Sequence, residues 1–339
     1  MTSLPKTFKG AAIVKSNAPV EIKEFDLREP GPGEVLVKVI ACGVCHTDLF
    51  VATGAFGEFW PRIPGHEIVG DVVSVGPNVT RVKNGDRVGG PWHGGHDNSC
   101  RSCARGHFQM CDNGKINGVS FDGGYAEYVI LRQEAVVRVP KDLDPAETAP
   151  LLCAGVTVFN AIRKQHVEQG NLVAVQGLGG LGHLAVQYAS KMGYRTVAIS
   201  SGSAKEEFAR KLGAHEYIDT SKDDPVKKLQ ALGGAALIVA TAPNPKAISP
   251  LIGGLQAAGK LIVLAPIGPV EFDTGIMITK GVSVAGWPSG HALDSEEAIQ
   301  FSLDHGVKCM IEKFPLAEAA KAMDHCHSGN VRFRGVLIM

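Results

Sequence analysis

Three side chains of the types that bind zinc are spread over the first half of the chain. Cys45 lies in the stretch IACGVCHTDL, His66 in PGHEIVG, and Cys153 in LLCAGVT. Two cysteines and one histidine form one of the catalytic zinc sets, in which a fourth position stays open for water or substrate. A single cysteine is more often a small buried hydrophobic residue, so spacing alone leaves both interpretations open. The donor types predict a catalytic zinc at Cys45, His66 and Cys153.

A second group of donors lies in the polar, glycine-rich segment 91–118, where three cysteines follow the pattern C-x2-C-x7-C. This segment cannot bury much apolar surface, so we expect another source of order. Four donors on one short loop are typical of a closed structural zinc site. The expected ligands are Asp97, Cys100, Cys103 and Cys111, with His93 and His96 as competing donors. A loop with three free thiols is the alternative.

A glycine-rich loop lies between an expected strand at 172–176 and an expected helix that runs to Met192. Its sequence has the form G-x-G-x-x-G. The glycines allow a tight turn and close backbone approach, and the N-terminus of the helix receives a dinucleotide pyrophosphate. Because the strand and the helix flank the motif as required, it predicts a dinucleotide site. The residues are Gly177, Leu178, Gly179, Gly180, Leu181 and Gly182.

The residues that follow the second expected strand, 196–200, bear on the choice between NAD and NADP. An Asp or Glu at this place would bond the adenosine ribose hydroxyls, but the chain has the sequence SSGSAK. No carboxylate repels a phosphate there, and Ser200, Ser201 and Lys205 can bind one. NADP is therefore favoured, and NAD is the alternative if Lys205 is only a solvated helix residue.

The elements that position these residues follow two patterns. Short strands between Gly and Pro turns predict a β-rich, barrel-like domain, whereas alternating strands and helices from residue 171 predict one doubly wound parallel sheet. The expected strands are 11–15, 21–25, 35–41, 68–75, 125–131, 136–139, 172–176, 196–200, 236–240, 261–264, 282–285 and 332–338. The main expected helices after the glycine-rich loop are 204–212, 225–232, 245–255, 296–305 and 317–328. We expect a catalytic domain at 1–155, a dinucleotide-binding domain at 156–290, and a return to the first domain at 291–339.

Composition narrows the class of protein. A chain of 339 residues with 45% hydrophobic and 20% charged residues is typical of a soluble globular protein of two domains. Its formal net charge is zero, without a basic patch, so neither nucleic acid nor an anionic membrane is an expected partner. No apolar run reaches membrane-spanning length, and no signal peptide is evident, so we expect a cytoplasmic protein. The eight cysteines then indicate metal binding more than disulfides.

These motifs together resemble the zinc-dependent alcohol dehydrogenases of the medium-chain dehydrogenase/reductase superfamily. The most specific part, G-H-E-x2-G-x5-G-x2-V from Gly65 to Val79, fits the family signature at each fixed position. CGVCHTD, LCAGVTV and GLGGLGHLAVQYASKMGY are similar to yeast-type alcohol dehydrogenases, and AISSGSAK is similar to the NADP-dependent cinnamyl alcohol dehydrogenases. The resemblance covers nearly the whole chain and implies an α/β protein with a GroES-like catalytic domain and a Rossmann domain.

The resemblance also implies roles for single residues. Glu67 would lie behind the catalytic zinc, Asp48 would bond the far nitrogen of the His66 ring, and Thr47 would pass the alcohol proton. The residues implied to contact the cofactor outside the glycine-rich loop are His46, Thr157 and Arg334. Near the substrate pocket the resemblance implies three aromatic residues, for which plain core packing is the alternative: Trp60, Trp92 and Trp287.

Two residues depart from the pattern of the family. Many relatives have a histidine where this chain has Phe50, so the proton relay must end at the ribose, at His46 or at water. At the structural site Asp97 stands where most relatives have cysteine.

The expected reaction is the reversible oxidation of an alcohol to an aldehyde or ketone. It would use two zinc ions per chain, a small-molecule substrate and a homodimer or homotetramer. Three alternatives remain open from the sequence. They are a zinc polyol or sugar dehydrogenase, a metal-independent enone reductase, and a non-enzymatic nucleotide-binding protein.

Overall fold

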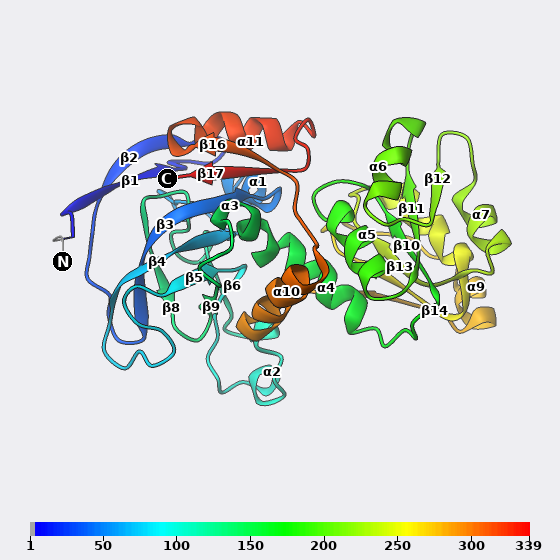
Figure 1. The fold of residues 1–339 in the computed structure, drawn as a ribbon, viewed down its shortest axis with the longest axis horizontal. Coiled ribbons are helices and arrows are strands. Elements are labelled where there is room, and N and C mark those ends of the chain that lie inside the picture. Colours follow the sequence, from blue (N-terminus) through cyan, green and yellow to red (C-terminus); the bar gives the residue numbers. More distant parts are fainter. Residues whose placement is uncertain (1–3) are drawn as a thin grey trace. The chain divides into compact units, whose positions relative to one another are not determined.

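The structure is a computed structural model that describes residues 4–339. The chain divides into two compact units, both drawn in Figure 1. The first unit contains the chain up to Val156 together with Gly290–Ser302 and Lys308–Met339, and the second contains Thr157–Ser289 and Leu303–Val307. Each unit therefore combines segments that are distant in the sequence.

The first unit is built on a seven-stranded sheet in the order β16-β17-β3-β4-β5-β9, with β8 also paired to β3. Its neighbouring strands are antiparallel except for β16 and β17. The strands are β3 (Glu34–Val44), β4 (Ile68–Val75), β5 (Arg87–Gly90), β8 (Tyr128–Arg132), β9 (Val137–Arg138), β16 (Ile311–Pro315) and β17 (Arg334–Ile338). Two further antiparallel pairs are β1 (Thr7–Ala12) with β2 (Glu21–Asp26), and β6 (His93–Gly95) with β7 (Lys115–Ile116).

Short helices connect these strands, and two longer helices lie in the C-terminal part of the chain. They are α1 (Thr47–Ala52), α2 (Arg101–Ala104), α3 (Pro145–Thr148), α10 (Ala292–His305) and α11 (Ala319–His327). Turns of 3-10 helix lie at Phe108–Met110, Ala149–Leu152 and Leu316–Glu318. The long strand β3 pairs with three others and is almost wholly buried, so its C-terminal end is a rigid support for the residues that follow.

The second unit is built on a six-stranded parallel sheet in the order β12-β11-β10-β13-β14-β15. This is the doubly wound order 3-2-1-4-5-6 of dinucleotide-binding sheets. The strands are β10 (Leu172–Gln176), β11 (Arg195–Ser200), β12 (Glu216–Asp219), β13 (Ala235–Ala240), β14 (Leu255–Val263) and β15 (Ser283–Gly286). The central strands are buried along their length, as expected for parallel strands covered on both faces.

The helices that alternate with these strands carry the chain from one strand to the next. They are α4 (Ala154–Arg163), which begins in the first unit, then α5 (Gly182–Lys191), α6 (Glu206–Lys211), α7 (Pro225–Ala231), α8 (Pro245–Ile248) and α9 (Thr274–Lys280). Turns of 3-10 helix lie at Ser203–Lys205 and Ser249–Gly254.

Several expected elements differ from the structure. The strand expected at 261–264 begins earlier, at Leu255, and the helix expected at 296–305 begins at Ala292. The strand predicted at 11–15 lies earlier, at Thr7–Ala12, where it pairs with β2. The helix predicted at 245–255 is only four residues of α-helix followed by a 3-10 segment that begins at Ser249. Pro250 explains this change, because proline lacks the amide hydrogen and its ring collides with the carbonyl four residues earlier in an α-helix.

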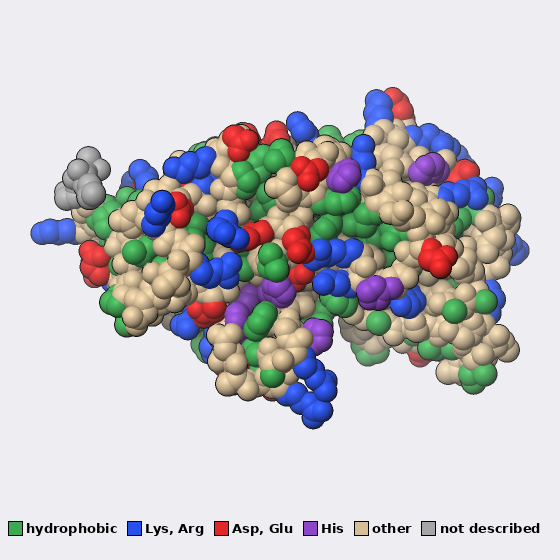
Figure 2. Space-filling model, turned by 60° about the horizontal axis from the view of Figure 1, so that its bottom comes forward, with side chains coloured by type: hydrophobic (Ala, Val, Ile, Leu, Met, Phe, Trp, Pro, Cys, Tyr) green, Lys and Arg blue, Asp and Glu red, His purple; other side chains and the backbone are tan. Residues whose placement is uncertain are grey.

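Two general properties bear on the class of protein. None of the helices within residues 4–339 is long and apolar enough to cross a membrane. On the face shown in Figure 2, basic and acidic side chains are interspersed, in keeping with the formal net charge of zero.

Candidate metal centre and cofactor site

Four donor side chains meet at one place in the first unit. Cys45, His66, Glu67 and Cys153 each offer a ligand atom, and these atoms all lie within 4.8 Å of one another. The sulfur atoms of Cys45 and Cys153 are 4.0 Å apart. His66 and Glu67 are fully buried. The structure therefore brings the three distant residues of the predicted catalytic zinc site together, with a carboxylate beside them.

The pairing of β3 with β4 explains why these residues meet. Cys45 follows the last residue of β3, and His66 and Glu67 precede the first residue of β4. The two strands are antiparallel, and the amide of Gly43 donates to the carbonyl of Glu67 over 3.0 Å. Cys153 lies between a 3-10 turn and α4, and that turn contacts both β3 and β4.

The electrostatics of the cluster favour a bound cation. The hydrogen bond between the two thiols lowers the pKa of Cys45 and raises the pKa of Cys153, so Cys45 is the thiol that ionises first. Burial opposes the charged form of His66, but Asp48 and Cys45 outweigh it and raise its pKa. Burial raises the pKa of Glu67 to about 8, although Arg334 opposes this shift. Negative charge in a buried cluster is stable only when a cation is close.

Glu67 has such a cation on one side. The guanidinium of Arg334 on β17 lies 2.8 Å from the Glu67 carboxylate, and both side chains are buried. Arg334 also donates to the backbone carbonyl of Val44 over 3.3 Å. The arginine thereby connects β17 to the end of β3 at the cluster.

Asp48 and Thr47, at the start of α1, border the cluster. One carboxylate oxygen of Asp48 lies 3.4 Å from Nδ1 of His66, and the other accepts the amide of Cys45 and the hydroxyl of Tyr125. The hydroxyl of Thr47 lies 3.6 Å from the sulfur of Cys45. Sequence reasoning did not identify Tyr125 as part of this network. The only local signal is its place after two glycines at the start of an expected strand.

The residues of this cluster fit a zinc ion. Their donor types are those of a catalytic zinc site with a position left for substrate. The Nε2 atom of His66 is buried and has no hydrogen-bond partner among the described residues. A buried polar atom of this kind is costly unless something satisfies it, and a cation shared with the thiolates would do so.

The predicted structural cluster also forms within the first unit. The ligand atoms of its four residues lie within 4.8 Å of one another, and the sulfurs of Cys100 and Cys111 are 3.8 Å apart. Cys100 is the N-cap of α2, which brings Cys103 onto the same side through one helical turn. Three thiols and a carboxylate around one point fit a four-coordinate zinc.

Asp97 and the two neighbouring histidines have different surroundings. Asp97 accepts the amides of Ser99 and Cys100 over 2.8 and 3.0 Å, and the side chain of Asn113 over 2.6 Å. These hydrogen bonds hold the pKa of Asp97 well below its usual range, and the bond from Asn113 makes the largest contribution. His93 and His96 contact one another instead, with ring nitrogens 3.2 Å apart. They do not belong to the cluster of four donors.

In the second unit, the glycine-rich loop joins β10 to α5 as the motif requires. A β-carbon on Gly182 would lie 1.9 Å from the carbonyl oxygen of Gly177, so only glycine allows the helix to begin this close to the strand. A β-carbon on Gly179 would meet nothing within 4 Å. The loop backbone is thus tightly packed on one side and open at Gly179, where a ligand can approach.

The segment after β11 is held by the neighbouring strand. Asp219, at the end of β12, accepts the amide of Gly202 over 2.7 Å and the hydroxyl of Ser221 over 2.6 Å. The hydroxyl of Tyr217 donates to the carbonyl of Gly202 over 2.6 Å. Ser200 ends β11, and Lys205 lies in the following 3-10 turn. Sequence reasoning missed Asp219 and Tyr217, because they belong to a different strand, β12.

The other predicted site residues lie in both units. Thr157 is buried within α4 in the second unit. His46 is the N-cap of α1, and its ring lies edge-on to Phe50 and His327 at 5.7 and 5.6 Å between centroids. Trp92 lies edge-on to the ring of His66 at 4.9 Å.

The two remaining tryptophans have surroundings of a different kind. Trp60 packs against the hydrophobic core of the first unit. Trp287 belongs to the second unit, where its ring nitrogen donates to the carbonyl of Ser289 over 2.9 Å. Of the three tryptophans, Trp92 is the one whose ring packs against a proposed zinc ligand.

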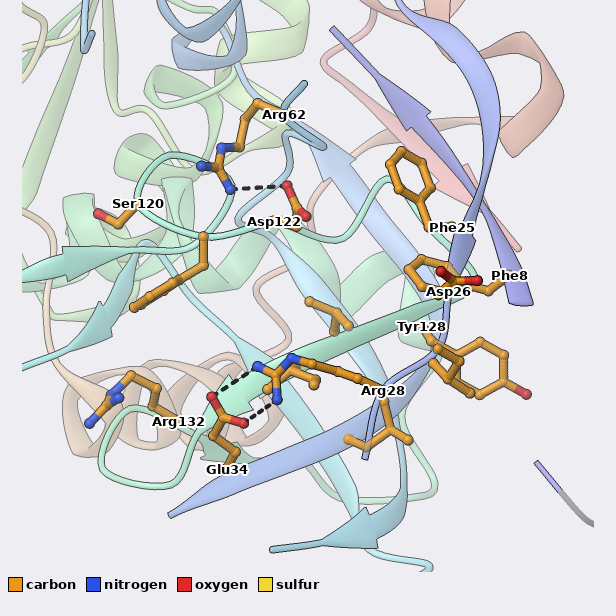
Figure 3. A pocket seen from close by; sticks show the side chains of 15 residues that line it. Phe8, Phe25, Asp26, Arg28, Glu34, Arg62, Ser120, Asp122, Tyr128 and Arg132 are labelled. Carbon is orange, nitrogen blue, oxygen red and sulfur yellow. Dashed lines mark hydrogen bonds and ion pairs between the residues drawn. The ribbon is translucent and has the colours of Figure 1, made fainter. Parts of the chain in front are cut away.

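A pocket of about 510 Å³ lies elsewhere in the first unit, and Figure 3 shows it. Its lining combines the rings of Phe8, Phe25 and Tyr128 with an ion pair between Arg28 and Glu34 at 2.6 Å. None of the four clustered donors lines it. The pocket is therefore not part of the metal centre.

The fold and the donor set define a zinc-binding dehydrogenase, and comparison with known proteins identifies the family. Residues 31–141 match the alcohol dehydrogenase GroES-like domain, and residues 180–304 match the zinc-binding dehydrogenase family. The alcohol dehydrogenase patD of Penicillium expansum is 55% identical over 338 residues, which cover 100% of this chain and 99% of that protein.

Solved structures agree with this assignment. A cinnamyl alcohol dehydrogenase from Sorghum bicolor has a TM-score of 0.89 and 34% identity, with 98% of each chain covered. An acetophenone reductase from Geotrichum candidum in complex with NAD has a TM-score of 0.87 and 26% identity, covering 99% of this chain and 98% of that one. The CAD from Helicobacter pylori complexed with NADP(H) has a TM-score of 0.85 and 26% identity, with 99% of each chain covered.

The chain therefore belongs to the zinc-dependent alcohol dehydrogenases of the medium-chain dehydrogenase/reductase superfamily. The predicted combination of a GroES-like domain with a Rossmann sheet is confirmed. The protein is an alcohol dehydrogenase that acts on small molecules with zinc and a nicotinamide cofactor.

Proposed function

We propose that the protein catalyses the reversible oxidation of an alcohol to an aldehyde or ketone, with NADP(H) as the favoured hydride carrier. The observation that carries the proposal is the convergence of Cys45, His66 and Cys153 on one buried point beside Glu67. When bound there, zinc supplies a Lewis acid for the substrate oxygen, which lowers the pKa of an alcohol or polarises a carbonyl.

The side chains around this point have separate tasks in the proposal. Thr47 hydrogen-bonds the substrate oxygen and moves its proton, and the hydroxyl lies 3.6 Å from the sulfur of Cys45. Asp48 orients the imidazole of His66 from the side opposite the free nitrogen. Arg334 compensates the charge of Glu67. Because Phe50 cannot carry a proton, the relay continues through His46, the cofactor ribose or water.

The cofactor proposal depends on the second unit and on the known roles of its motif. The loop Gly177–Gly182 and the N-terminus of α5 bind the pyrophosphate, with Thr157, His46 and Arg334 as further contacts. For the adenosine end we favour NADP, because Ser200, Ser201 and Lys205 offer donors to a phosphate. Asp219 brings a carboxylate close to this segment, but its Oδ1 accepts backbone and hydroxyl groups and its Oδ2 lies 3.6 Å from Nζ of Lys222, so its charge is partly compensated. The NAD and NADP(H) complexes among similar structures leave both cofactors to be tested.

The substrate class follows from the aromatic side chains beside His66. Trp92 lies 4.9 Å from the His66 ring, Phe56 lies 6.1 Å from Trp92, and Phe50 lies 6.5 Å from Phe56. A series of rings that leads to the metal centre favours hydrophobic or aromatic substrates. We therefore propose faster turnover of aromatic than of short aliphatic aldehydes.

The proposal includes the remaining organisation of the protein. A second, structural zinc is held by the cluster of Asp97, Cys100, Cys103 and Cys111. Residues 1–155 and 291–339 form the catalytic domain, and 156–290 form the dinucleotide-binding domain. The compact units have similar limits, but Leu303–Val307 belongs to the second unit. The active form is a cytoplasmic homodimer or homotetramer.

The test compares initial rates with NADPH and NADH across aliphatic and aromatic aldehydes. We expect NADPH and an aromatic aldehyde to give the highest kcat/KM. Cys45→Ser and His66→Ala should lose at least a thousandfold in kcat, on the order of a lost Lewis acid, while they keep NADPH binding in a fluorescence titration. Full activity of wild-type protein after verified removal of zinc would refute the mechanism.

A further inference from the structure

Tyr125 is a fully buried residue that reaches the metal centre from a segment without any of the proposed ligands. Its hydroxyl donates to Oδ2 of Asp48 over 2.8 Å, although 77 residues separate the two in the sequence. The same oxygen accepts the amide of Cys45 over 2.9 Å. The other oxygen, Oδ1, is thereby left 3.4 Å from Nδ1 of His66.

The backbone around Tyr125 is attached to the segment that carries His66. The amides of Gly123, Gly124 and Tyr125 donate to the carbonyls of Ile63, Gly65 and Pro64 over 2.7, 3.0 and 3.1 Å. A β-carbon on Gly65 would lie 2.5 Å from the Tyr125 ring, so the ring packs directly on the residue before His66. The position of the phenol is therefore fixed relative to the imidazole.

This arrangement determines how the Asp48 carboxylate is oriented. Rotation about the last torsion of an aspartate is soft, and the Asp48 side chain is fully buried, so the protein groups around it set its orientation. Two donors on Oδ2 keep that oxygen away from His66, so Oδ1 faces the imidazole. Without the phenol, only the Cys45 amide would remain on Oδ2.

We propose that Tyr125 is a positioning residue for the metal centre, whose hydroxyl holds Asp48 so that one carboxylate oxygen stays on the His66 ring. This inference depends on the proposed zinc site at Cys45, His66 and Cys153. Groups that orient a metal-bound histidine typically change metal affinity or activity about 10- to 100-fold. Tyr125 contacts Asp48 and not the histidine itself. Removal of its hydroxyl should therefore have a smaller effect on metal affinity, about three- to tenfold.

The decisive variant is Tyr125→Phe, which keeps the buried ring and removes only the hydroxyl. The matched control is Tyr128→Phe, the same change three residues later on β8, in a ring that lines the separate pocket of Figure 3. The first measurement is the rate at which each protein releases catalytic zinc to a chromogenic chelator. We expect Tyr125→Phe to release it about three- to tenfold faster than wild type, and Tyr128→Phe to match wild type.

Three further measurements separate positioning from plain stabilisation. In the cobalt-substituted protein, the visible absorption bands should shift in Tyr125→Phe and not in Tyr128→Phe, because they report the ligand geometry. In the background of Asp48→Asn, the added Tyr125→Phe change should not accelerate zinc release further, since both act through one carboxylate. In Tyr125→Phe, the kcat should be lower than in wild type, in line with its faster zinc release, while the KM for NADPH stays unchanged.

The outcomes distinguish this inference from the proposal on which it depends. If wild type binds zinc at Cys45 and Tyr125→Phe keeps wild-type release and cobalt spectrum, the inference is wrong and the zinc site stands. Additive effects of the two changes on zinc release would also overturn it. If wild type holds no zinc that Cys45→Ser removes, the proposed function itself fails.

Discussion

The role of Asp97 in the second cluster can be decided by one substitution. Asp97 differs from its three neighbours in the cluster, because it is a carboxylate and already accepts three hydrogen bonds. A residue that only caps this turn and a residue that also binds zinc would have the same contacts. Asp97→Asn separates the two roles, because asparagine keeps one oxygen for the amides of Ser99 and Cys100.

The expected size of the effect follows from what asparagine loses. Its second terminal atom is a donor that faces the donor nitrogen of Asn113, where the carboxylate accepts over 2.6 Å. It also lacks the negative charge that the low pKa of Asp97 maintains. Loss of groups that only orient a ligand costs about 10- to 100-fold in metal affinity, and loss of a ligand should cost at least as much. We therefore expect zinc release from this cluster to accelerate at least tenfold.

The assay counts zinc per chain and follows its release to a chelator. Wild type should release two zinc ions in two phases, and Cys111→Ser identifies the phase that belongs to this cluster. Asn113→Ala is the matched control, because it removes the outer partner and leaves the carboxylate in place. If Asp97→Asn keeps both ions at wild-type rates while Cys111→Ser loses one, Asp97 is a capping residue only.

Two other predictions concern stability and the cofactor loop. Burial lowers the pKa of His93 to about 3, so its stabilising contribution is complete above the ordinary pKa of 6.5 and is lost as the pH falls below it. His93→Gln should therefore lose less thermal stability than wild type between pH 7.5 and pH 5, and equal losses would contradict this. Gly182→Ala, whose β-carbon would collide with Gly177, should lower stability by about 1–3 kcal/mol. Gly179→Ala should fold like wild type yet bind NADPH more weakly, and calorimetric melting with NADPH titration distinguishes the pair.

Local sequence patterns predicted much of the fold. The strand expected at 68–75 coincides with β4, and the strand expected at 172–176 coincides with β10. Both are rich in apolar residues and are followed by a glycine, so their limits are encoded within a few residues. The glycine-rich loop was predicted equally well, because its function needs a strand before it and a helix after it.

Contacts between distant segments were harder to predict. Nothing near Tyr125 in the sequence indicates Asp48, because their hydrogen bond depends on how residues 63–65 pair with 123–125. Asp219 holds Gly202 for a similar reason, since parallel pairing of β11 and β12 brings their ends together. For the donor set itself, residue types suggested Cys45 and Cys153 as partners, and the family resemblance supported that choice, whereas spacing alone did not.

The glycines of the family signature show why a motif can predict where a side chain lies better than it predicts what that side chain binds. A β-carbon on Gly70 would lie 2.3 Å from the carbonyl of Lys38, and one on Gly76 would lie 1.8 Å from the carbonyl of Gly31. Both glycines thus allow β4 and the turn after it to pack against backbone, which fixes where His66 emerges. These requirements hold whether or not a metal is bound. The signature therefore predicts the location of the imidazole, and only the two distant thiols identify it as a ligand.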